Sequence, residues 1–436
     1  MTHSFERLFA IGSSGTTWYQ SIVGAPACLR RPAGCDLSRG IVANDRAQTV
    51  TFHLARRDPD FLYKLTLAYA EVLPGSIPDS QARSPLPATG PYQLSRYVPA
   101  NEVLLTRNPH FREWSAAAQP EGFPTRLLLR LDLSGAQGVS SVAHGGADFM
   151  ANLGQIPGRH ATYFLVHHRD QARVNPMMET SFMFLNVRTA PFNDIRVRRA
   201  LNLALDRARI VDSYGGRVAA RPTCQILPPG IPGYRRYCPY TRNSAGDGRW
   251  RAPDLLRARR PVAASGTAGM KVTVWNISGP QTNDETGDTV TALTQLGFRA
   301  TLRFLPDSTY FTFTNDSRNR VQVIDGGWGA DYASANDFIG KLTCNYYVPA
   351  NGPATTDASE FCDPAVDRQV ALADSLQSTD PPAASARWAR IDRELTNLAI
   401  WLPTGTPNEV DLLSRRVGNY RYNPVWGVLL DQLWVR

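Results

Sequence analysis

Lysine is almost absent from this chain of 436 residues. Lys64, Lys271 and Lys341 are its only lysines, so arginine supplies almost all of its positive charge. The net charge is +9. A basic chain binds nucleic acid or a membrane surface when its charge is concentrated on one face or along one helix. Here the arginines are scattered, and a solvated helix face explains their densest groups. We therefore expect no nucleic-acid partner.

Long apolar runs are also missing. No window approaches the ~18 consecutive apolar residues of a membrane-spanning helix, and the opening THSFERLF lacks the basic and apolar regions of an export signal. The composition, 43% apolar and 19% charged, is ordinary for a globular protein. At roughly 100 to 200 residues per domain, the length predicts two or three domains.

Cysteines are few, but the six that occur fall into three local couples. Each couple lies in a loop-like stretch rich in Pro, Gly or Asn, and short bridges of this kind suit an oxidising compartment. Free buried thiols stay an alternative, because spacing alone does not determine pairing. Since no couple has the close spacing of zinc ligands, we expect no metal site. The candidate disulfides are Cys28 with Cys35, Cys224 with Cys238, and Cys344 with Cys362.

The common catalytic motifs are absent as well. GSSG at 12–15 has the wrong spacing for a nucleophile elbow, and Gly340-Lys341 is followed by Leu342 instead of the Ser or Thr of a phosphate-binding loop. HRDQARVN at 168–175 matches the kinase catalytic loop, but the Gly-rich loop and D-F-G motif that kinases need are missing. We therefore expect no enzyme and no cofactor.

What the chain does contain is a succession of strand and helix patterns. TVTFHL from Thr49, EVLLTRN from Glu102 and TRLLLRL from Thr125 predict strands in a β-rich first part, and SFMFLNV from Ser181 predicts a buried strand. One amphipathic helix is expected next, with Asn193 or Asp194 as its N-cap. Its apolar stripe comprises residues 197, 200, 201, 204 and 205.

Beyond Pro222 strands and helices alternate. MKVTVW, GDTVTALTQLG, FRATLRFL, a helical stretch near Tyr310 and VQVIDGGW predict a β-α-β-α-β series in a mostly parallel sheet. Ligands of such sheets gather beyond the carboxyl ends of the strands. Trp275 and Asn276 end the first strand of this series, and GGWGAD ends the last. Two long helices and a strand-like C-terminal stretch are expected to follow.

An acid without a neighbouring base marks the stretch GGWGADYASANDF at 326–338. A carboxylate that loses hydration in a cleft stays charged only with a cation or several donors as partners. No Lys or Arg lies in this stretch, so the cation that pairs with Asp331 is expected to arrive with a ligand. A helix N-cap, for a segment that includes Asp337 and Phe338, is an equally supported role on the residues alone.

Several stretches resemble family 5 solute-binding proteins of ABC transporters, the oligopeptide, dipeptide and nickel binders. FLNVRTAPFNDIRVRRALNLALDRARIVDSYGG at 184–216 is the most specific of them. The others are PATGPYQLSRYVPANEVLLTRNPHF at 87–111, GGWGADYASANDF, IDRELTNLAIWLPTG at 391–405, and TVTFHL. The resemblance covers essentially the whole chain.

The resemblance implies an α/β architecture, the two-lobed periplasmic binding protein type II-like fold with mixed sheets and a hinge. The implied parts are a β-rich subdomain of the first lobe at 1–89, the first-lobe core at 90–188, the second α/β lobe at 189–410, and a return to the first lobe at 411–436. Family members begin with an export signal and further strands. Since THSFERLF resembles a point well inside the family pattern, we expect this chain to lack that N-terminal segment.

The implied function is that of an extracytoplasmic receptor, at the cell surface or in the periplasm. It would bind a small-molecule or peptide ligand, short peptides above all, by closure of the two lobes. Its partners would be the membrane permease subunits of an ABC importer, and it would act as a monomer without chemistry of its own. Two alternatives stay open: a ligand-sensing module of a fused or regulatory receptor, and, with little support, a hydrolase.

The resemblance also implies site residues. In peptide-binding members the Asp of W-x-A-D-Y pairs with the α-ammonium group of the ligand, which makes Asp331 the candidate anchor. Trp328 and Tyr332 would supply apolar walls, and Gly326 and Gly327 would let the backbone approach the ligand.

Four further candidates have weaker support, because a core or turn role explains each as well: Trp275, Asn276, Tyr310 and, at the crossover between lobes, Asn186. ASAN at 333–336 departs from the Asp-Pro pair of many members. We therefore do not carry over any ligand contact made by that pair.

Overall fold

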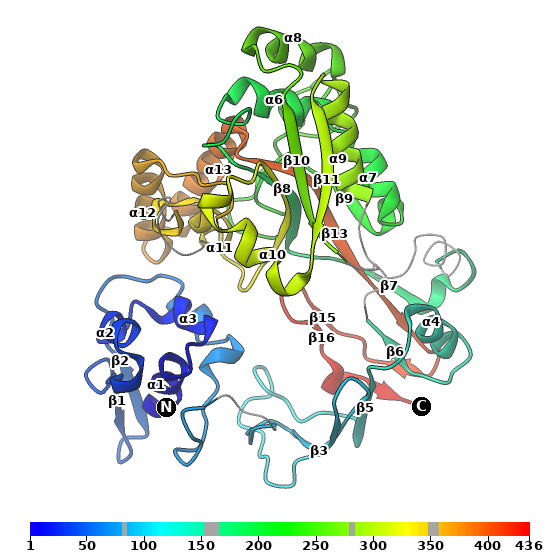
Figure 1. Ribbon diagram of the computed structural model, residues 1–436. Coiled ribbons are helices and arrows are strands. Elements are labelled where there is room, and N and C mark those ends of the chain that lie inside the picture. The colour runs from blue at the N-terminus through cyan, green and yellow to red at the C-terminus, as the bar shows by residue number, and fades with distance from the viewer. Residues whose placement is uncertain (81–84, 152–164, 279–283, 348–356) are drawn as a thin grey trace. The chain divides into compact units, whose positions relative to one another are not determined.

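The computed structural model describes residues 1–80, 85–151, 165–278, 284–347 and 357–436 (Figure 1). The chain divides into two compact units. The first comprises Met1–Leu133, Gly418–Arg421 and Leu429–Arg436, and the second comprises Ser134–Val417 and Tyr422–Val428. The lobe boundaries expected from the sequence stay a prediction.

The N-terminal part of the first unit is mainly helical, which differs from the β-rich expectation. Three helices, α1 (Thr2–Ala10), α2 (Ala25–Arg30) and α3 (Phe61–Lys64), accompany a single hairpin of β1 (Ile41–Asn44) and β2 (Thr49–Phe52) in the described residues up to position 80. The reason lies in THSFERLFA, whose Phe5, Leu8 and Phe9 share one helix face and are buried in the local core.

The rest of the first unit contains the other strands predicted there. β3 (Tyr92–Val98), β4 (Glu102–Arg107) and β5 (Arg126–Arg130) form an antiparallel sheet in chain order. The predictions for EVLLTRN and TRLLLRL are therefore confirmed. At the C-terminal end, the closing strand pattern is reduced to the short β17 (Trp434–Val435).

A mixed sheet forms the centre of the second unit. Its strand order is β11 (Arg299–Leu305), β10 (Lys271–Ile277), β12 (Val323–Gly329), β8 (Glu179–Leu185) and β13 (Trp401–Leu413). The predicted β-α-β-α-β series is confirmed, with α9 (Asp284–Gln295) and α10 (Asp307–Thr314) as its helices. Parallel pairing is limited to β10 with β11 and β12, because β8 and β13 enter antiparallel from outside the series.

The long strand β13 continues beyond this sheet (Figure 1). It pairs in turn with β9 (Ala220–Pro222), β7 (Ala172–Pro176) and β6 (Phe149–Met150), and contacts α4 (Gly135–Ala143). A small hairpin of β15 (Tyr422–Asn423) and β16 (Gly427–Val428) also belongs to the second unit, and β14 (Val417–Gly418) lies at its boundary.

The single helix predicted after the buried strand is divided into two helices in the structure. α6 (Ile195–Ala204) begins at Asp194, whose carboxylate accepts from the N–H of Arg196 at 2.8 Å, as expected of an N-cap. It ends at Leu205, and the next residue, Asp206, caps α7 (Arg207–Ser213) by accepting from two N–H groups of its first turn. The second cap satisfies the donors that the break exposes, and the predicted apolar stripe lies entirely on α6 and its C-cap Leu205.

Two cores lie on opposite faces of the sheet because side chains alternate along its strands. Met183 and Leu185 of β8 pack in a core with residues of α6, α7, α9 and α8 (Leu255–Ser265). Phe182 faces the other way and stacks on Trp401 at 3.7 Å between ring centroids. That second core contains residues of α11 (Asn336–Ile339), α12 (Pro364–Gln377) and α13 (Pro381–Leu398).

All six cysteines form disulfides in the pairs that their spacing suggests. The Cα atoms lie 4.4 Å apart in Cys28–Cys35, 4.9 Å apart in Cys224–Cys238 and 4.4 Å apart in Cys344–Cys362. Each bridge closes a short loop within one unit. Covalent closure of a loop reduces the conformational freedom of the unfolded chain and thereby stabilises the fold.

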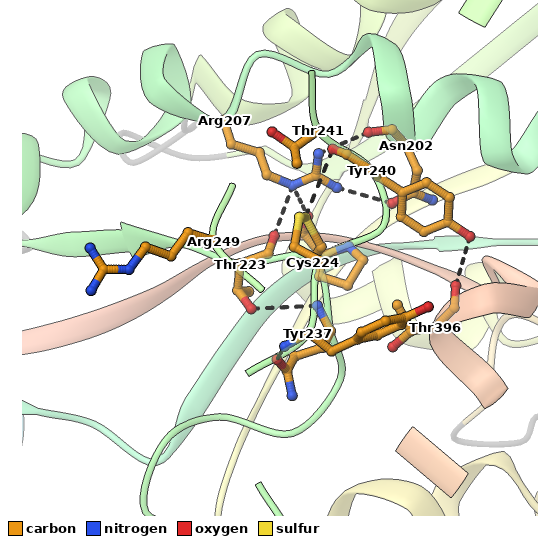
Figure 2. The surroundings of a disulfide bond; sticks show 12 residues. Asn202, Arg207, Thr223, Cys224, Tyr237, Tyr240, Thr241, Arg249 and Thr396 are labelled. Carbon is orange, nitrogen blue, oxygen red and sulfur yellow. Dashed lines mark hydrogen bonds between the residues drawn. A yellow bond between two sulfur atoms is a disulfide. The ribbon is translucent and has the colours of Figure 1, made fainter. Parts of the chain in front are cut away.

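Arg207 is fully buried beside the Cys224–Cys238 bridge (Figure 2). Its Nε donates to the carbonyls of Pro403 at 2.7 Å and Thr223 at 2.8 Å, while Nη1 and Nη2 donate to the backbone and side-chain oxygens of Asn202 at 2.8 and 3.0 Å. Burial lowers the pKa of Arg207 to about 9, so it still carries its proton at neutral pH. The side chain therefore ties α6, β13 and the disulfide loop together.

Removing this side chain should cost far more than removing a neighbouring arginine. Arg207→Met would leave several buried carbonyls without donors, and we expect the free energy of unfolding to fall by about 3 kcal/mol. Arg209, on the same helix, is largely exposed and pairs with Asp288 at 3.1 Å. Arg209→Met should cost less than about 1 kcal/mol. Urea unfolding of both variants measures the difference, and equal losses would contradict the structural role of Arg207.

Candidate ligand-binding site

The glycines of β12 lie on both faces of the strand. Gly326 and Trp328 share one face of the strand, because they are two residues apart. A Cβ at Gly326 would lie 2.8 Å from the ring of Phe184. Packing therefore explains Gly326. Gly327 and Gly329 lie on the other face and are exposed, so their backbone is open to a ligand.

The candidate anchor Asp331 lies just beyond the end of β12, where a lysine accompanies it. The Nζ atom of Lys341 is 4.3 Å from the ring centroid of Trp328 and 5.3 Å from that of Tyr346. Burial raises the pKa of Asp331, and the positive charge of Lys341 opposes that rise. The expectation that the protein supplies no cation to Asp331 is wrong: the chain turns through α11 and brings Lys341 back to it.

Asp337 is a second carboxyl in this group, which we call the Asp331 cluster: Trp328, Asp331, Asp337 and Lys341. Its Oδ2 accepts from the backbone N–H of Asp331 at 2.8 Å. Burial, together with the negative charge of Asp331, raises the pKa of Asp337 to about 7. The N-cap alternative for Asp331 is wrong, because Ala335 occupies that position of α11.

One oxygen of the anchor lacks a partner. The side chain of Asp337 interacts with the Asp331 carboxyl and lowers its pKa, but Asp331 Oδ2 is buried and accepts no hydrogen bond in the structure. A buried acceptor without a donor is costly, so a ligand that donates a hydrogen bond here would be favoured. The site can therefore pair with a cationic donor, although it already contains a lysine.

Tyr310, another predicted residue, links the neighbouring strands β10 and β12, and the predicted residue Trp275 provides one of the two carbonyls. The Tyr310 hydroxyl, in a side chain that is 1% exposed, donates to the carbonyls of Asp325 at 2.8 Å and Trp275 at 3.2 Å. Trp275 is half-buried, and its ring centroid lies 5.0 Å from that of Phe313. These contacts account for both residues structurally, and their contact with a ligand stays a prediction.

The remaining predicted residues are buried. Asn276 donates to the Thr286 hydroxyl at 3.2 Å, and Tyr332 lies in the interior next to Asp331. Asn186 donates to Glu360 at 3.0 Å and accepts from the N–H of Arg188 at 3.0 Å, which orders the turn after β8. The structure thus brings Trp328 and Asp331 together at one place, and Asn186 lies in a different contact network.

Sequence reasoning missed Lys341 and gave Asp337 no place in the site. Both lie on or after a short helix that reverses the chain, and a count of charges along the linear stretch does not detect such a return. The one available signal was the scarcity of lysine, which makes Lys341 conspicuous.

Within the described ranges, no three His, Cys, Asp or Glu side chains gather in an arrangement able to hold a metal ion. Nor does any helix in those ranges combine the length and the apolarity that crossing a membrane requires.

The model of the bacterial extracellular solute-binding proteins, family 5 Middle, matches residues 2–347. The chain belongs to this family. Similar curated proteins include the periplasmic oligopeptide-binding protein OppA of Salmonella typhimurium, 22% identical over 79% of this chain and 60% of the relative. The probable periplasmic-binding protein SapA of Escherichia coli is 32% identical over 41% of this chain and 32% of the relative. The chain thus spans 60% or less of the length of these two relatives.

Solved structures of the same fold cover the whole chain. Clavulanic acid biosynthesis oligopeptide binding protein 2 matches 100% of this chain and 79% of its own, with a TM-score of 0.83 and 23% identity. The murein tripeptide binding protein MppA of Escherichia coli matches 100% of this chain and 82% of its own, with a TM-score of 0.75 and 19% identity. These likenesses confirm the predicted α/β fold class.

The pKa of Asp337 predicts a pH dependence of stability. Because its pKa is about 7 in the folded protein and ordinarily 3.8, the folded state retains a proton that the unfolded state releases as the pH rises from about 4 to 7. The free energy of unfolding should therefore fall over that range. Asp337→Asn removes this contribution and should gain about 1 kcal/mol or more over wild type between pH 4.5 and pH 8.

Urea unfolding at several pH values measures this gain. Asp212→Asn, which removes an exposed acid of α7, is the matched control and should follow the wild-type pH profile. If Asp337→Asn shows the same profile as that control, the proton assigned to Asp337 lies elsewhere.

Proposed function

We propose that this protein is an extracytoplasmic receptor of an ABC importer that binds short peptides by closure of its two lobes. Membership of the solute-binding family supports the receptor role. Relatives named for oligopeptide, di/tripeptide and glutathione binding favour a peptide ligand. The three disulfides suit an oxidising compartment outside the cytoplasm. Permease subunits would be its partners, and the protein would act as a monomer without covalent chemistry.

The observation that carries the proposal is the state of Asp331. Its carboxylate follows the end of β12, near Lys341, and one of its oxygens is buried without a donor. The α-ammonium group of a peptide supplies three N–H donors and a positive charge. It would thus give the buried oxygen a hydrogen-bond donor and neutralise the charge of the carboxylate. Lys341 has a supporting role, because its charge favours the ionised form of Asp331 before the ligand arrives.

One anchor can serve several peptides because it supplies only part of the binding affinity. A charge-assisted hydrogen bond is worth about 1.5 to 3 kcal/mol, so the ammonium contact orients the ligand and leaves most of the affinity to other contacts. The backbone at the exposed glycines of β12 offers contacts that do not depend on ligand side chains. The sensing-module alternative has no observation in its favour.

Peptide binding should depend on a free α-ammonium group and on the charge of Asp331. We expect wild type to bind trialanine at least about tenfold more tightly than N-acetyl-trialanine, because acetylation removes the charge and two donors. Asp331→Asn should lose a similar factor for trialanine and little for the acetylated peptide. Isothermal titration calorimetry measures all four affinities.

Asp212→Asn, with the same change in net charge, should bind both peptides as wild type does. If wild type and Asp331→Asn bind trialanine equally, Asp331 is not the anchor. If wild type binds no short peptide at all, the peptide ligand itself is wrong.

A further inference from the structure

Three carboxyls converge on the face of β12 opposite to Trp328. Asp325 shares this face with Gly327 and Gly329, and Glu179 of β8 pairs directly with Gly329. Glu285, in the first turn of α9, lies close enough for its charge to act on Asp325, and the charge of Glu179 acts on Glu285 in turn. We call Glu179, Asp325 and Glu285 the acidic recess.

The recess borders bare backbone. A Cβ at Gly329 would lie 3.5 Å from Oε2 of Glu179, and one at Gly327 would lie 3.9 Å from its Oε1, so the carboxylate stands beside two glycines that are themselves exposed. Glu179 and Asp325 are partly exposed, whereas Glu285 is 2% exposed. The three carboxyls of the recess therefore range from partly exposed to fully buried.

Glu285, the most buried of the three acids, has one carboxylate oxygen without a hydrogen-bond donor. Its Oε2 accepts a hydrogen bond from the Tyr214 hydroxyl, and the nearby Thr404 hydroxyl acts on the carboxyl but donates to the carbonyl of Ser181 at 2.9 Å, so the buried Oε1 accepts no hydrogen bond. A buried carboxylate oxygen without a donor is rare in folded proteins and calls for an explanation. A donor supplied by a bound molecule explains it here, since Glu285 also lies within electrostatic range of two further acids, Glu179 and Asp325.

Among the described residues, no Lys or Arg forms an ion pair with any of the three carboxyls. Arg209, the basic partner of neighbouring Asp288, is bonded to that residue at 3.1 Å. Burial raises the pKa of all three recess carboxyls, and repulsion between neighbouring acids adds to the rise for Asp325 and Glu285. The Asp331 cluster differs, because Lys341 accompanies its acids.

We propose that Glu179, Asp325 and Glu285 form a subsite for a basic side chain of the bound peptide, arginine above all. A guanidinium has five N–H donors in a planar fork and remains charged when it is desolvated, so it can bond carboxylates that approach from different directions. The compact ammonium of lysine has three donors and a larger hydration cost. The subsite rests on the proposed function, since the basic side chain is part of the peptide held at Asp331.

A matched pair of peptides tests the subsite. Ala-Arg-Ala and Ala-citrulline-Ala have nearly the same shape, but citrulline carries a neutral group in place of the guanidinium. Calorimetry should show that wild type binds the arginine peptide about tenfold or more tightly, since charge-assisted bonds into a carboxylate recess are lost with citrulline. Asp325→Asn and Glu179→Gln should abolish that preference and keep wild-type affinity for the citrulline peptide.

Asp212→Asn, the control with the same change in net charge, should keep the preference. Equal binding of the two peptides by wild type would overturn the subsite and leave the peptide receptor intact. This wild-type comparison decides the question even if a recess variant fails to fold.

Agmatine, the decarboxylated form of arginine, separates the two proposals. It should raise the melting temperature of wild type and of Asp212→Asn, but not that of Asp325→Asn. If agmatine does so while neither peptide binds, the subsite stands and the peptide function fails. If agmatine and both peptides leave wild type unchanged, the subsite and the peptide function are both wrong.

Discussion

The antiparallel pairing of β12 with β8 is the constraint on which the rest of the site depends. Its register places Gly327 opposite Ser181 and Gly329 opposite Glu179, and so decides which side chains share a face. A shift by one residue would move every side chain of the strand to the other face. The same pairing buries Phe182 and Phe184 against the position of Gly326, where any larger residue would collide with a ring.

The two faces of β12 both lie near buried acids but differ in how far those acids are compensated by a cation. On the Trp328 side, Lys341 compensates part of the charge of Asp331 and Asp337. On the other side, Glu179, Asp325 and Glu285 influence one another without such compensation. Lys341 thus favours the ionised form of Asp331 in the free protein. The acids of the recess have no such partner among the described residues, so a cation from a ligand would stabilise their ionised forms. One strand can thereby recognise two different groups of the same ligand.

Much of the fold was predictable, because its elements depend on local patterns. Alternating residues at 102–107 and 126–130 predicted strands, and Asp194 was identified as an N-cap, since a cap requires only its neighbours in sequence. The helix from Asp194 was overextended because helix-forming sequence with the apolar residues Ile210 and Val211 continues beyond the break that Asp206 caps. The helical N-terminal part was not predicted, because the strand pattern at Thr49 represents only the single hairpin there and not the amphipathic helix Thr2–Ala10. Motif resemblance identified Asp331 as the candidate anchor, because the W-x-A-D-Y motif is contiguous in sequence.

The sequence by itself determined the order of strands and helices, the local cysteine pairs and the motif that contains Asp331, because each depends on residues close together in the chain. Tertiary structure alone decided that Lys341 returns to Asp331, that Gly326 packs against rings while Gly327 and Gly329 stay exposed, and that Glu285 comes within electrostatic range of Glu179 and Asp325. The physical reason is that electrostatic and packing energies depend on distance in space. Strand register sets that distance for residues far apart in sequence, and no linear pattern encodes it.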